Sequence, residues 1–164
     1  MIITTPNDRD IVITKEFAAP RRLVFDAHTR PELLRRWFGP QGWQLEVCEI
    51  DLRPGGAWHY LMRGRDGAEM TLRGTYVEIV APERIVTTES NADCYARAAH
   101  ESLNTLVLVE RDGHTTLTNT VRFPSTRVRD AVLASGMEHG VAQGHERLAA
   151  LLAGTATPAT PAGR

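Results

Sequence analysis

The sequence predicts a single α+β domain in which a twisted antiparallel sheet wraps around one long C-terminal helix. The chain has 164 residues, which is the usual length of one domain. Between residues 43 and 123, short β-branched or alternating segments follow one another with turn residues between them. A long segment with helical spacing of apolar residues then follows Pro124.

In the N-terminal part of the domain, the sequence predicts one strand and two short helices. Residues 11–17 are expected to form a strand, because β-branched residues dominate them and their apolar side chains alternate. Pro20 suits the first turn of a short helix, where its missing N–H costs nothing. Thr29 and Glu32 have the spacing of a capping box, so a second short helix is expected to start there and end before Gly39.

Six further strands are predicted, each bounded by Gly, Pro, Asp or Asn. They are 43–50, 57–63, 69–79, 84–89, 102–111 and 115–123. With the first strand they make a seven-stranded sheet. Because short turns join consecutive strands, the sheet is expected to be an antiparallel meander and not a set of βαβ units.

Two turns have sequences typical of tight hairpins. Gly67 closes a three-residue loop and would occupy the left-handed position. The resulting register pairs Met62 with Met70 and Trp58 with Gly74. Asp112 and Gly113 predict a second hairpin between two long strands.

The last helix is expected to be capped by Ser125 or Thr126 and to run uninterrupted for about 27 residues. Residues 10–153 would then form the domain. We expect 1–9 to be flexible and 154–164, a tail of small residues, to be disordered.

Several strings along the chain resemble activator-of-heat-shock-protein-ATPase-like domains, a branch of the START-like (SRPBCC) superfamily. The resemblance covers about 130 residues and is carried by 19–27, 29–40, 51–58, 74–79, 82–85, 136–140 and 146–148. It implies the helix-grip fold and a cavity between the sheet and the long helix. In relatives such a cavity holds lipids, polyketides or other apolar molecules, and in eukaryotic co-chaperones the domain contacts a heat-shock ATPase. A fold alone does not fix a function.

Composition excludes several classes of protein. The formal net charge is −1, so the chain lacks the basic surface of a nucleic-acid binder and does not indicate a membrane surface. No apolar stretch approaches the roughly 20 residues that span a bilayer, and the N-terminus does not look like a secretory signal. The expected location is the cytoplasm. Cys48 and Cys94 show no zinc or disulfide spacing, and no metal or cofactor is expected.

One wall of the expected cavity can be named from the hairpin register. Aromatic and sulfur-containing side chains would share the inner face of this hairpin, opposite the helix. The candidate ligand-binding residues are Trp58, Tyr60, Met62, Met70, Leu72, Tyr76, Met137, Gly140, Val141 and Gly144. The alternative is that these residues only fill the core.

Three glycines of the last helix, Gly136, Gly140 and Gly144, each cost about 1 kcal/mol relative to Ala inside a helix. Either the helix backbone approaches the sheet closely, under Trp58 or Trp43, or the missing side chains leave volume for a ligand. The sequence leaves both explanations open.

No catalytic group can be assigned from the sequence. The histidines, among them His28 and His59, lack metal-ligand spacing and are interpreted as surface or structural residues. A carboxylate facing the cavity could transfer protons, and the alternation cannot decide among Asp51, Glu78 and Glu89. Arg53 is interpreted as a partner of a carboxylate at the Gly55 turn, and the loop 91–101 as a lid or a surface excursion.

The leading functional hypothesis is therefore a protein that binds a hydrophobic or aromatic small molecule. The first alternative is an enzyme of the cyclase, dehydratase or hydrolase type that uses an inward carboxylate or His. The second is a co-chaperone-like interaction domain, although a single domain without a partner segment does not favour a heat-shock ATPase partner. A homodimer through a sheet edge or an exposed helix is also left open.

Overall fold

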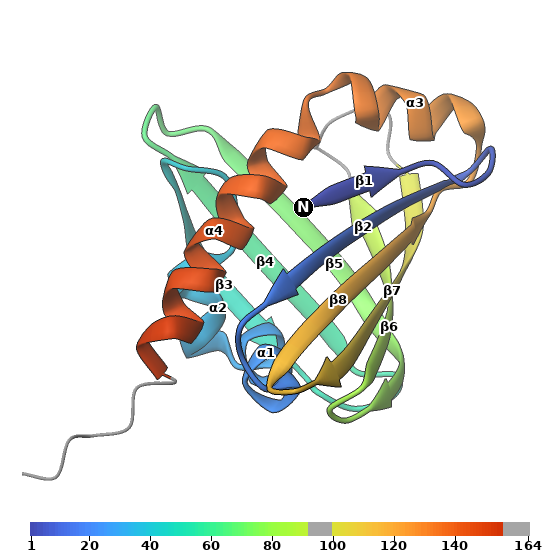
Figure 1. Ribbon diagram of the computed structural model, residues 1–164. Coiled ribbons are helices and arrows are strands. Elements are labelled where there is room, and N and C mark those ends of the chain that lie inside the picture. Colours follow the sequence, from blue (N-terminus) through green and yellow to red (C-terminus); the bar gives the residue numbers. More distant parts are fainter. Residues whose placement is uncertain (92–99, 156–164) are drawn as a thin grey trace, which may run out of the picture.

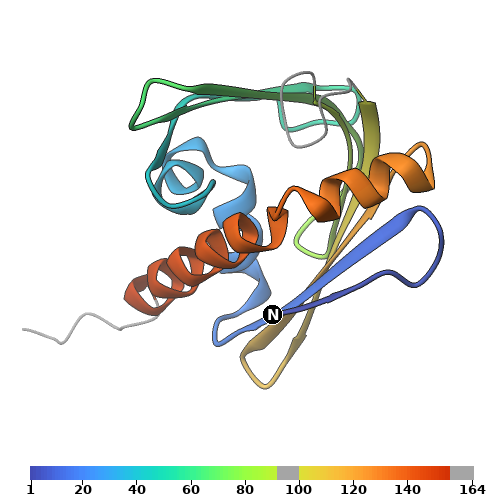
Figure 2. The ribbon, with the colours of Figure 1, turned by 90° about the horizontal axis from the view of Figure 1, so that it is seen from above.

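A computed structural model describes residues 1–91 and 100–155 of the chain. Eight antiparallel strands form one sheet in the order β1-β2-β8-β7-β6-β5-β4-β3. The strands are β1 (Ile2–Thr4), β2 (Asp10–Phe17), β3 (Trp43–Ile50), β4 (Ala57–Gly64), β5 (Glu69–Val80), β6 (Arg84–Asn91), β7 (His100–Arg111) and β8 (His114–Arg122). The sheet is strongly curved, and the C-terminal helix lies across its open side (Figures 1 and 2).

Four helices accompany the sheet. Helices α1 (Arg21–Thr29) and α2 (Pro31–Trp37) connect β2 to β3, and α3 (Thr126–Ala134) and α4 (Met137–Thr155) follow β8. Helix α2 packs against α4, so the two short helices close one end of the space between α4 and the sheet (Figure 1). The α+β class and the antiparallel meander agree with the sequence prediction.

The sheet has eight strands and not the seven expected. The additional strand is β1, which lies within the segment 1–9 that the sequence analysis treats as flexible, and it pairs with β2 through Ile3 and Ile13. Three residues are too few for a periodicity signal, so only the pairing with β2 identifies this strand. At the other end α4 ends at Thr155, and the expected disordered tail beyond it lies outside the described residues, as do Cys94 and most of the loop 91–101.

The expected uninterrupted C-terminal helix is wrong. It consists of α3 and α4, which are separated at Ser135 and Gly136, and Gly136 has a φ of 77°. A residue with positive φ cannot continue a right-handed helix, and glycine adopts this conformation without steric cost. The apolar spacing continues across the break, and for this reason the sequence pattern did not reveal it.

Local turn chemistry is confirmed at both hairpins. Met62 pairs with Met70 and Trp58 with Gly74, as the turn at Gly67 predicts. Gly67 has a φ of 82°, and at the β7–β8 turn Asp112 and Gly113 have φ values of 50° and 76°.

The helix starts agree with the sequence only in part. Ser125 caps α3, since its hydroxyl oxygen accepts a hydrogen bond from the Val128 N–H at 3.3 Å. The capping box at Thr29 is wrong: α2 starts after Arg30, and the Thr29 hydroxyl donates to the Phe25 carbonyl of α1 at 2.9 Å. Thr29 therefore belongs to the end of one helix and not to the start of the next.

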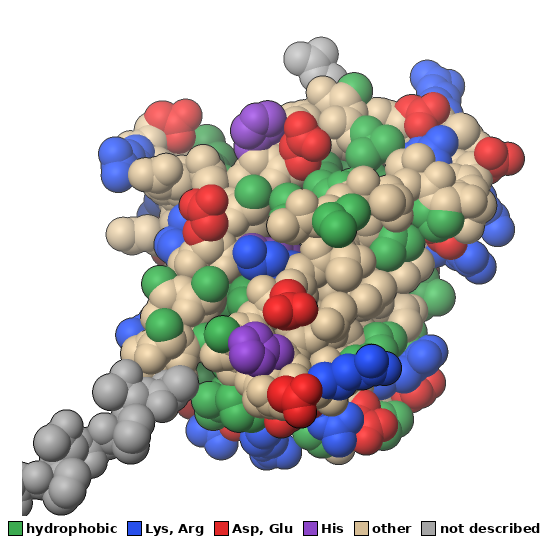
Figure 3. All heavy atoms as spheres, viewed as in Figure 1, with side chains coloured by type: hydrophobic (Ala, Val, Ile, Leu, Met, Phe, Trp, Pro, Cys, Tyr) green, Lys and Arg blue, Asp and Glu red, His purple; other side chains and the backbone are tan. Residues whose placement is uncertain are grey.

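The buried side chains form two clusters. The larger contains the aromatic residues of β4 and β5, the inner faces of α1 and α2, and Leu148, Leu151 and Leu152 of α4. The smaller lies between the start of β2 and α3, around Ile11 and Val132. On the face shown in Figure 3, acidic and basic side chains are interspersed, without a large area of one sign.

Candidate functional site

A pocket with a volume of about 260 Å³ lies between the concave face of the sheet, the segment after α2 and helix α4. Its apolar lining comes from every layer of the fold: Ile13, Trp37, Phe38, Pro40, Trp58, Tyr60, Met62, Leu72, Tyr76, Ile85, Leu106, Leu117 and Val141. Its polar lining residues are His28, Thr87, Glu89, Asn104, Asn119 and His145, and Gly39, Gly140 and Gly144 complete it.

Aromatic rings form the wall built by β4. Alternate residues of this strand are buried, which turns Trp58, Tyr60 and Met62 toward the pocket. The ring centres of Trp58 and Tyr60 are 4.7 Å apart, and Phe38 lies edge-on to Tyr60 at 5.2 Å. Burial raises the pKa of Tyr76 to about 12, so its hydroxyl stays protonated at neutral pH. The wall is thus apolar, with hydroxyl groups that can donate or accept hydrogen bonds.

The helix side of the pocket explains one of the glycines. A Cβ on Gly140 would lie 3.2 Å from the Pro40 ring, which is a tight contact, whereas one on Gly144 would lie 3.6 Å from the carbonyl oxygens of Trp37 and Gly39, an ordinary van der Waals distance. The close approach is therefore to the segment that follows α2, and the expected approach to Trp58 or Trp43 is wrong. Arg147 holds the same segment by donating to the Trp37 and Gly39 carbonyls.

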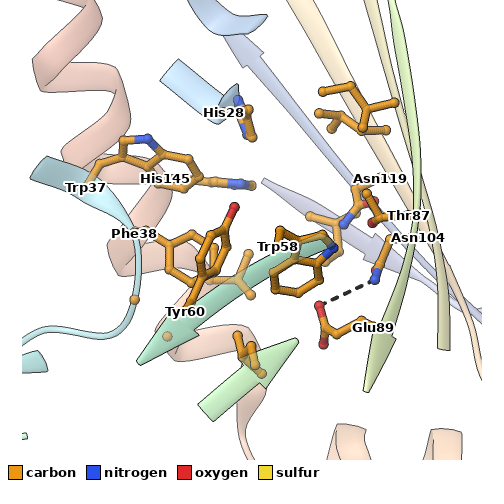
Figure 4. Close-up of a pocket in the computed structure, with 18 of the residues that line it drawn as sticks. His28, Trp37, Phe38, Trp58, Tyr60, Thr87, Glu89, Asn104, Asn119 and His145 are labelled. Carbon is orange, nitrogen blue, oxygen red and sulfur yellow. Dashed lines mark hydrogen bonds between the residues drawn. The ribbon is translucent and has the colours of Figure 1, made fainter. Parts of the chain in front are cut away.

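Four polar side chains gather on the opposite side of the pocket. Thr87 and Glu89 come from β6, Asn104 from β7 and Asn119 from β8, and Figure 4 shows them across the pocket from Trp37, Phe38, Tyr60 and His145. The Asn104 amide donates to a Glu89 carboxylate oxygen at 3.4 Å. Burial raises the pKa of Glu89 to about 7, although the hydrogen bond from Asn104 opposes this. The pocket therefore holds a carboxyl group that can take up and release a proton near neutral pH.

Of the three carboxylates that the sequence left open, Glu89 faces the pocket. Asp51 is exposed and pairs with Arg53 at 2.9 Å, so Arg53 has the carboxylate partner that its position predicts. Glu78 is also exposed and pairs with Arg84 at 3.1 Å. Alternation from Tyr76 would turn Glu78 inward, but the register of β5 shifts between these two residues. A bulge adds one residue to a strand, so side chains beyond it point to the opposite face of the sheet from the one that simple alternation predicts, and Glu78 points to solvent.

Two histidines line the pocket, and burial lowers the pKa of each to about 4. His28 has its Nδ1 2.7 Å from the Val24 carbonyl oxygen, which fits the structural role expected for it. His145, to which the sequence assigns no metal-binding role because it and His139 would lie on different helix faces, is edge-on to Phe17 at a ring distance of 5.7 Å. Both rings are neutral at pH 7. His59 lies outside the pocket, with its Nδ1 3.5 Å from Glu49.

Eight of the ten residues named as candidate pocket lining surround the pocket: Trp58, Tyr60, Met62, Leu72, Tyr76, Gly140, Val141 and Gly144. Met70 and Met137 do not. Met70 packs at the edge of the larger cluster, and Met137 packs against the smaller cluster because the helix break precedes it.

Of the polar lining, the sequence named Glu89 and His28 only as open candidates and gave no indication of Thr87, Asn104 and Asn119. Ile85, Thr87 and Glu89 are every second residue of β6, so their side chains share the face that lines the pocket. If Ile85 is taken as an inward apolar residue, the same alternation predicts that Glu89 faces inward. Val86 is equally apolar and is also buried, so the alternation did not reveal which face of β6 lines the pocket.

Within the described ranges 1–91 and 100–155, no three His, Cys, Asp or Glu side chains are grouped so that they could hold a metal ion. No helix of these ranges combines the length and hydrophobicity that crossing a membrane requires.

A curved antiparallel sheet that closes on a C-terminal helix around a pocket defines the helix-grip class of START-like proteins. The chain belongs to the family described as activator of Hsp90 ATPase homolog 1-like protein, whose model matches residues 18–153. The scaffold of this superfamily is in general one that binds ligands.

Solved structures of bacterial proteins are similar over almost the whole chain. A Rhodobacter sphaeroides protein is 26% identical with a TM-score of 0.86, and the match covers 95% of this chain and 100% of that one. A Mycobacterium smegmatis protein is 28% identical with a TM-score of 0.83, covering 94% and 98%. The AHSA1 protein of Silicibacter pomeroyi, at 23% identity and a TM-score of 0.71 over 89% and 99%, is similar in fold. No curated protein matches the sequence.

Proposed function

We propose that this protein binds a small hydrophobic or aromatic molecule in the pocket between the sheet and α4. The observation that supports this best is the pocket itself, because aromatic and aliphatic side chains enclose it and a few polar groups lie on one side. Binding sites for small molecules have this composition, in which apolar area supplies affinity and sparse polar groups fix orientation.

The size of the pocket limits the ligand. Sites for drug-sized molecules usually have volumes of about 300–1,000 Å³, and this pocket, at about 260 Å³, is slightly smaller. We therefore expect a compact ligand of one or two rings and not a long-chain lipid.

Thermal denaturation with two-ring aromatic compounds tests the proposal. A compound present at 100 times its dissociation constant should raise the free energy of unfolding by about 2.7 kcal/mol and the melting temperature with it. Val141→Phe should abolish the rise, because residue 141 lines the pocket and the added ring would occupy it. Ala150→Phe places the same ring on an exposed position of α4 and should keep the rise.

Failure of every one- and two-ring aromatic compound to shift the melting temperature would reject ligand binding of this kind. An equal shift in Val141→Phe and the unchanged protein would place the binding site elsewhere.

One observation favours a second function, an enzyme that acts on such a ligand. Glu89 lies in an apolar pocket with its pKa raised to about 7, the range in which a carboxyl group can both accept and donate a proton near neutral pH. If the pocket is catalytic, Glu89→Gln should abolish turnover of a bound compound, as followed by mass spectrometry. Glu16→Gln on the exposed face of β2 should not affect it. Recovery of every bound compound unchanged would leave binding as the function.

The family's name refers to an activator of the Hsp90 ATPase, and that activity belongs to the protein after which the family is named. No feature of residues 1–91 and 100–155 described above supports that activity in this chain, so we do not propose it.

A further inference from the structure

The pocket contains buried polar atoms that lack hydrogen-bond partners. Trp58 is 6% exposed, and its indole Nε1, a donor, has no acceptor among the described residues. Asn119 Oδ1, an acceptor, is also buried without a donor in the same part of the chain. Buried donors and acceptors are almost always paired in folded proteins, so each unpaired atom in a pocket indicates where a ligand group can bind.

Strand packing brings these atoms to the polar side of the pocket. Gly74 lies opposite Trp58 on β5, and a Cβ there would lie 2.7 Å from Nε1 and would overlap the Thr88 carbonyl oxygen of β6. Because residue 74 has no side chain, the indole lies over β5 and its N–H reaches β6. The N–H is thereby placed on the side where Glu89 lies (Figure 4).

Asn119 reaches the same side from β8. It pairs with Leu106 of β7, two residues from Asn104, and Asn104 pairs with Thr87 of β6. Residues two apart on a strand point to the same face, so both amides and the Thr87 hydroxyl face the pocket together. Figure 4 shows Asn119, Asn104 and Glu89 on one side of Trp58.

His145 Nδ1 also lacks a partner among the described residues, but it lies on the other side of the pocket (Figure 4). The two unpaired atoms on the polar side, Trp58 Nε1 and Asn119 Oδ1, suit a ligand group that both accepts and donates. A hydroxyl group has one donor and two acceptor sites, so it can accept from Trp58 Nε1 and donate to Asn119 Oδ1 or Glu89. An ammonium group only donates and would leave the indole N–H unpaired. A carboxylate only accepts, and no Lys or Arg lines the pocket among the described residues to offset its charge.

We propose that the ligand is an uncharged aromatic molecule that carries a hydroxyl group, and that this hydroxyl lies against Trp58, Glu89 and Asn119. This inference rests on the proposed ligand binding and adds the chemical class and orientation of the ligand. The ring system then packs against Tyr60, Phe38 and the α4 side of the pocket.

Three probes of the same ring system test the class: 2-naphthol, 2-methylnaphthalene and 2-naphthoate. Their dissociation constants can be measured by following the amide signals of the labelled protein in NMR titrations near pH 7. We expect 2-naphthol to bind about tenfold or more tightly than 2-methylnaphthalene, because a pocket with unpaired polar groups discriminates against an analogue that cannot pair with them. The charged 2-naphthoate should bind at least tenfold more weakly than 2-naphthol.

Two substitutions test the orientation. Trp58→Phe removes the N–H and keeps an aromatic ring, and Asn119→Leu removes the acceptor at nearly the same side-chain size. Each should reduce the preference for 2-naphthol over 2-methylnaphthalene to about threefold or less while 2-methylnaphthalene still binds. Trp43→Phe, which changes a tryptophan outside this pocket, should retain the full preference.

The outcomes separate this inference from the proposed function. Equal binding of 2-naphthol and 2-methylnaphthalene, or tight binding of 2-naphthoate, would overturn the hydroxyl class while hydrophobic binding stands. An undiminished preference in both Trp58→Phe and Asn119→Leu would overturn the orientation. If none of the three probes binds, the proposed function itself fails.

Discussion

At the scale of single residues, the pocket depends on polar side chains that the sheet turns inward among aromatic rings. Glu89 shows the consequence most clearly, because its pKa rises to about 7 where the apolar pocket disfavours the ionised form. The other titratable groups that line the pocket are Tyr60, Tyr76, His28 and His145, and all four are neutral at pH 7. None of them supplies a positive charge that would hold Glu89 ionised.

Glu89 should therefore make stability depend on pH. Its folded pKa, about 7, exceeds the ordinary value of 4.5, so between these pH values the folded state binds more protons than the unfolded state. The free energy of unfolding falls as pH rises through this window, and the full penalty is present above about pH 7. Glu89→Gln should remove this penalty and stabilise the protein by about 1–3 kcal/mol at about pH 8, with little effect near pH 4.

Urea denaturation at both pH values measures this difference. Glu16→Gln on the exposed face of β2 is the matched control and should show no such pH dependence. An equal effect of Glu89→Gln at the two pH values would show that its carboxyl group is not perturbed by burial.

At the scale of elements, the break between α3 and α4 lets the two helices pack on different parts of the sheet. Val132 of α3 belongs to the cluster at the start of β2, whereas Leu148 of α4 belongs to the cluster that surrounds the pocket. A single straight helix could not pack against both of these regions of the curved sheet (Figure 2). The left-handed conformation of Gly136 supplies the change of direction.

Gly136→Ala should destabilise the protein by about 1–2 kcal/mol, because alanine pays a backbone penalty at positive φ. The nearest atom to the new Cβ would be His139 Nδ1 at 3.9 Å, so backbone strain and not a clash is responsible. Gly154→Ala in α4 has no such strain and should stabilise by about 0.5–1 kcal/mol. Denaturant unfolding of both variants checks this, and a stabilising Gly136→Ala would contradict the role given to the break.

At the scale of the whole molecule, α4 holds the curved sheet closed over the pocket. Leu148 is fully buried in the cluster that joins α4 to the inner faces of the sheet and of α1 and α2. Leu148→Ala should therefore cost about 3 kcal/mol, from lost burial and the cavity left behind. Leu52→Ala, at a side chain that is 42% exposed, should cost less than about 0.5 kcal/mol.

The measurement is denaturant unfolding followed by circular dichroism, with the slope against denaturant compared between variants. An unchanged slope would show that α4 and the sheet unfold as one unit. A loss for Leu148→Ala no larger than for Leu52→Ala would mean that α4 does not stabilise the sheet.

The sequence by itself determined most of the secondary structure and the hairpin registers of this protein. Turn residues at Gly67 and Gly113 specify local pairings, and alternation in β4 specifies which rings face inward, since both depend on neighbours along the chain. Five pocket-lining residues, Trp58, Tyr60, Met62, Leu72 and Tyr76, could be named from these local rules. The break at Gly136 left no trace in the apolar spacing, which continues on both sides of it.

Only the tertiary structure decided how the polar groups of the pocket come together. Glu89, Asn104 and Asn119 lie on three strands, and their meeting depends on the registers in which β6 pairs with β7 and β7 pairs with β8. The position of the Trp58 indole depends on Gly74 of the neighbouring strand and on the Thr88 carbonyl beyond it. These are contacts between residues distant in sequence, and a local pattern carries no information about them because their geometry is set by packing across the sheet.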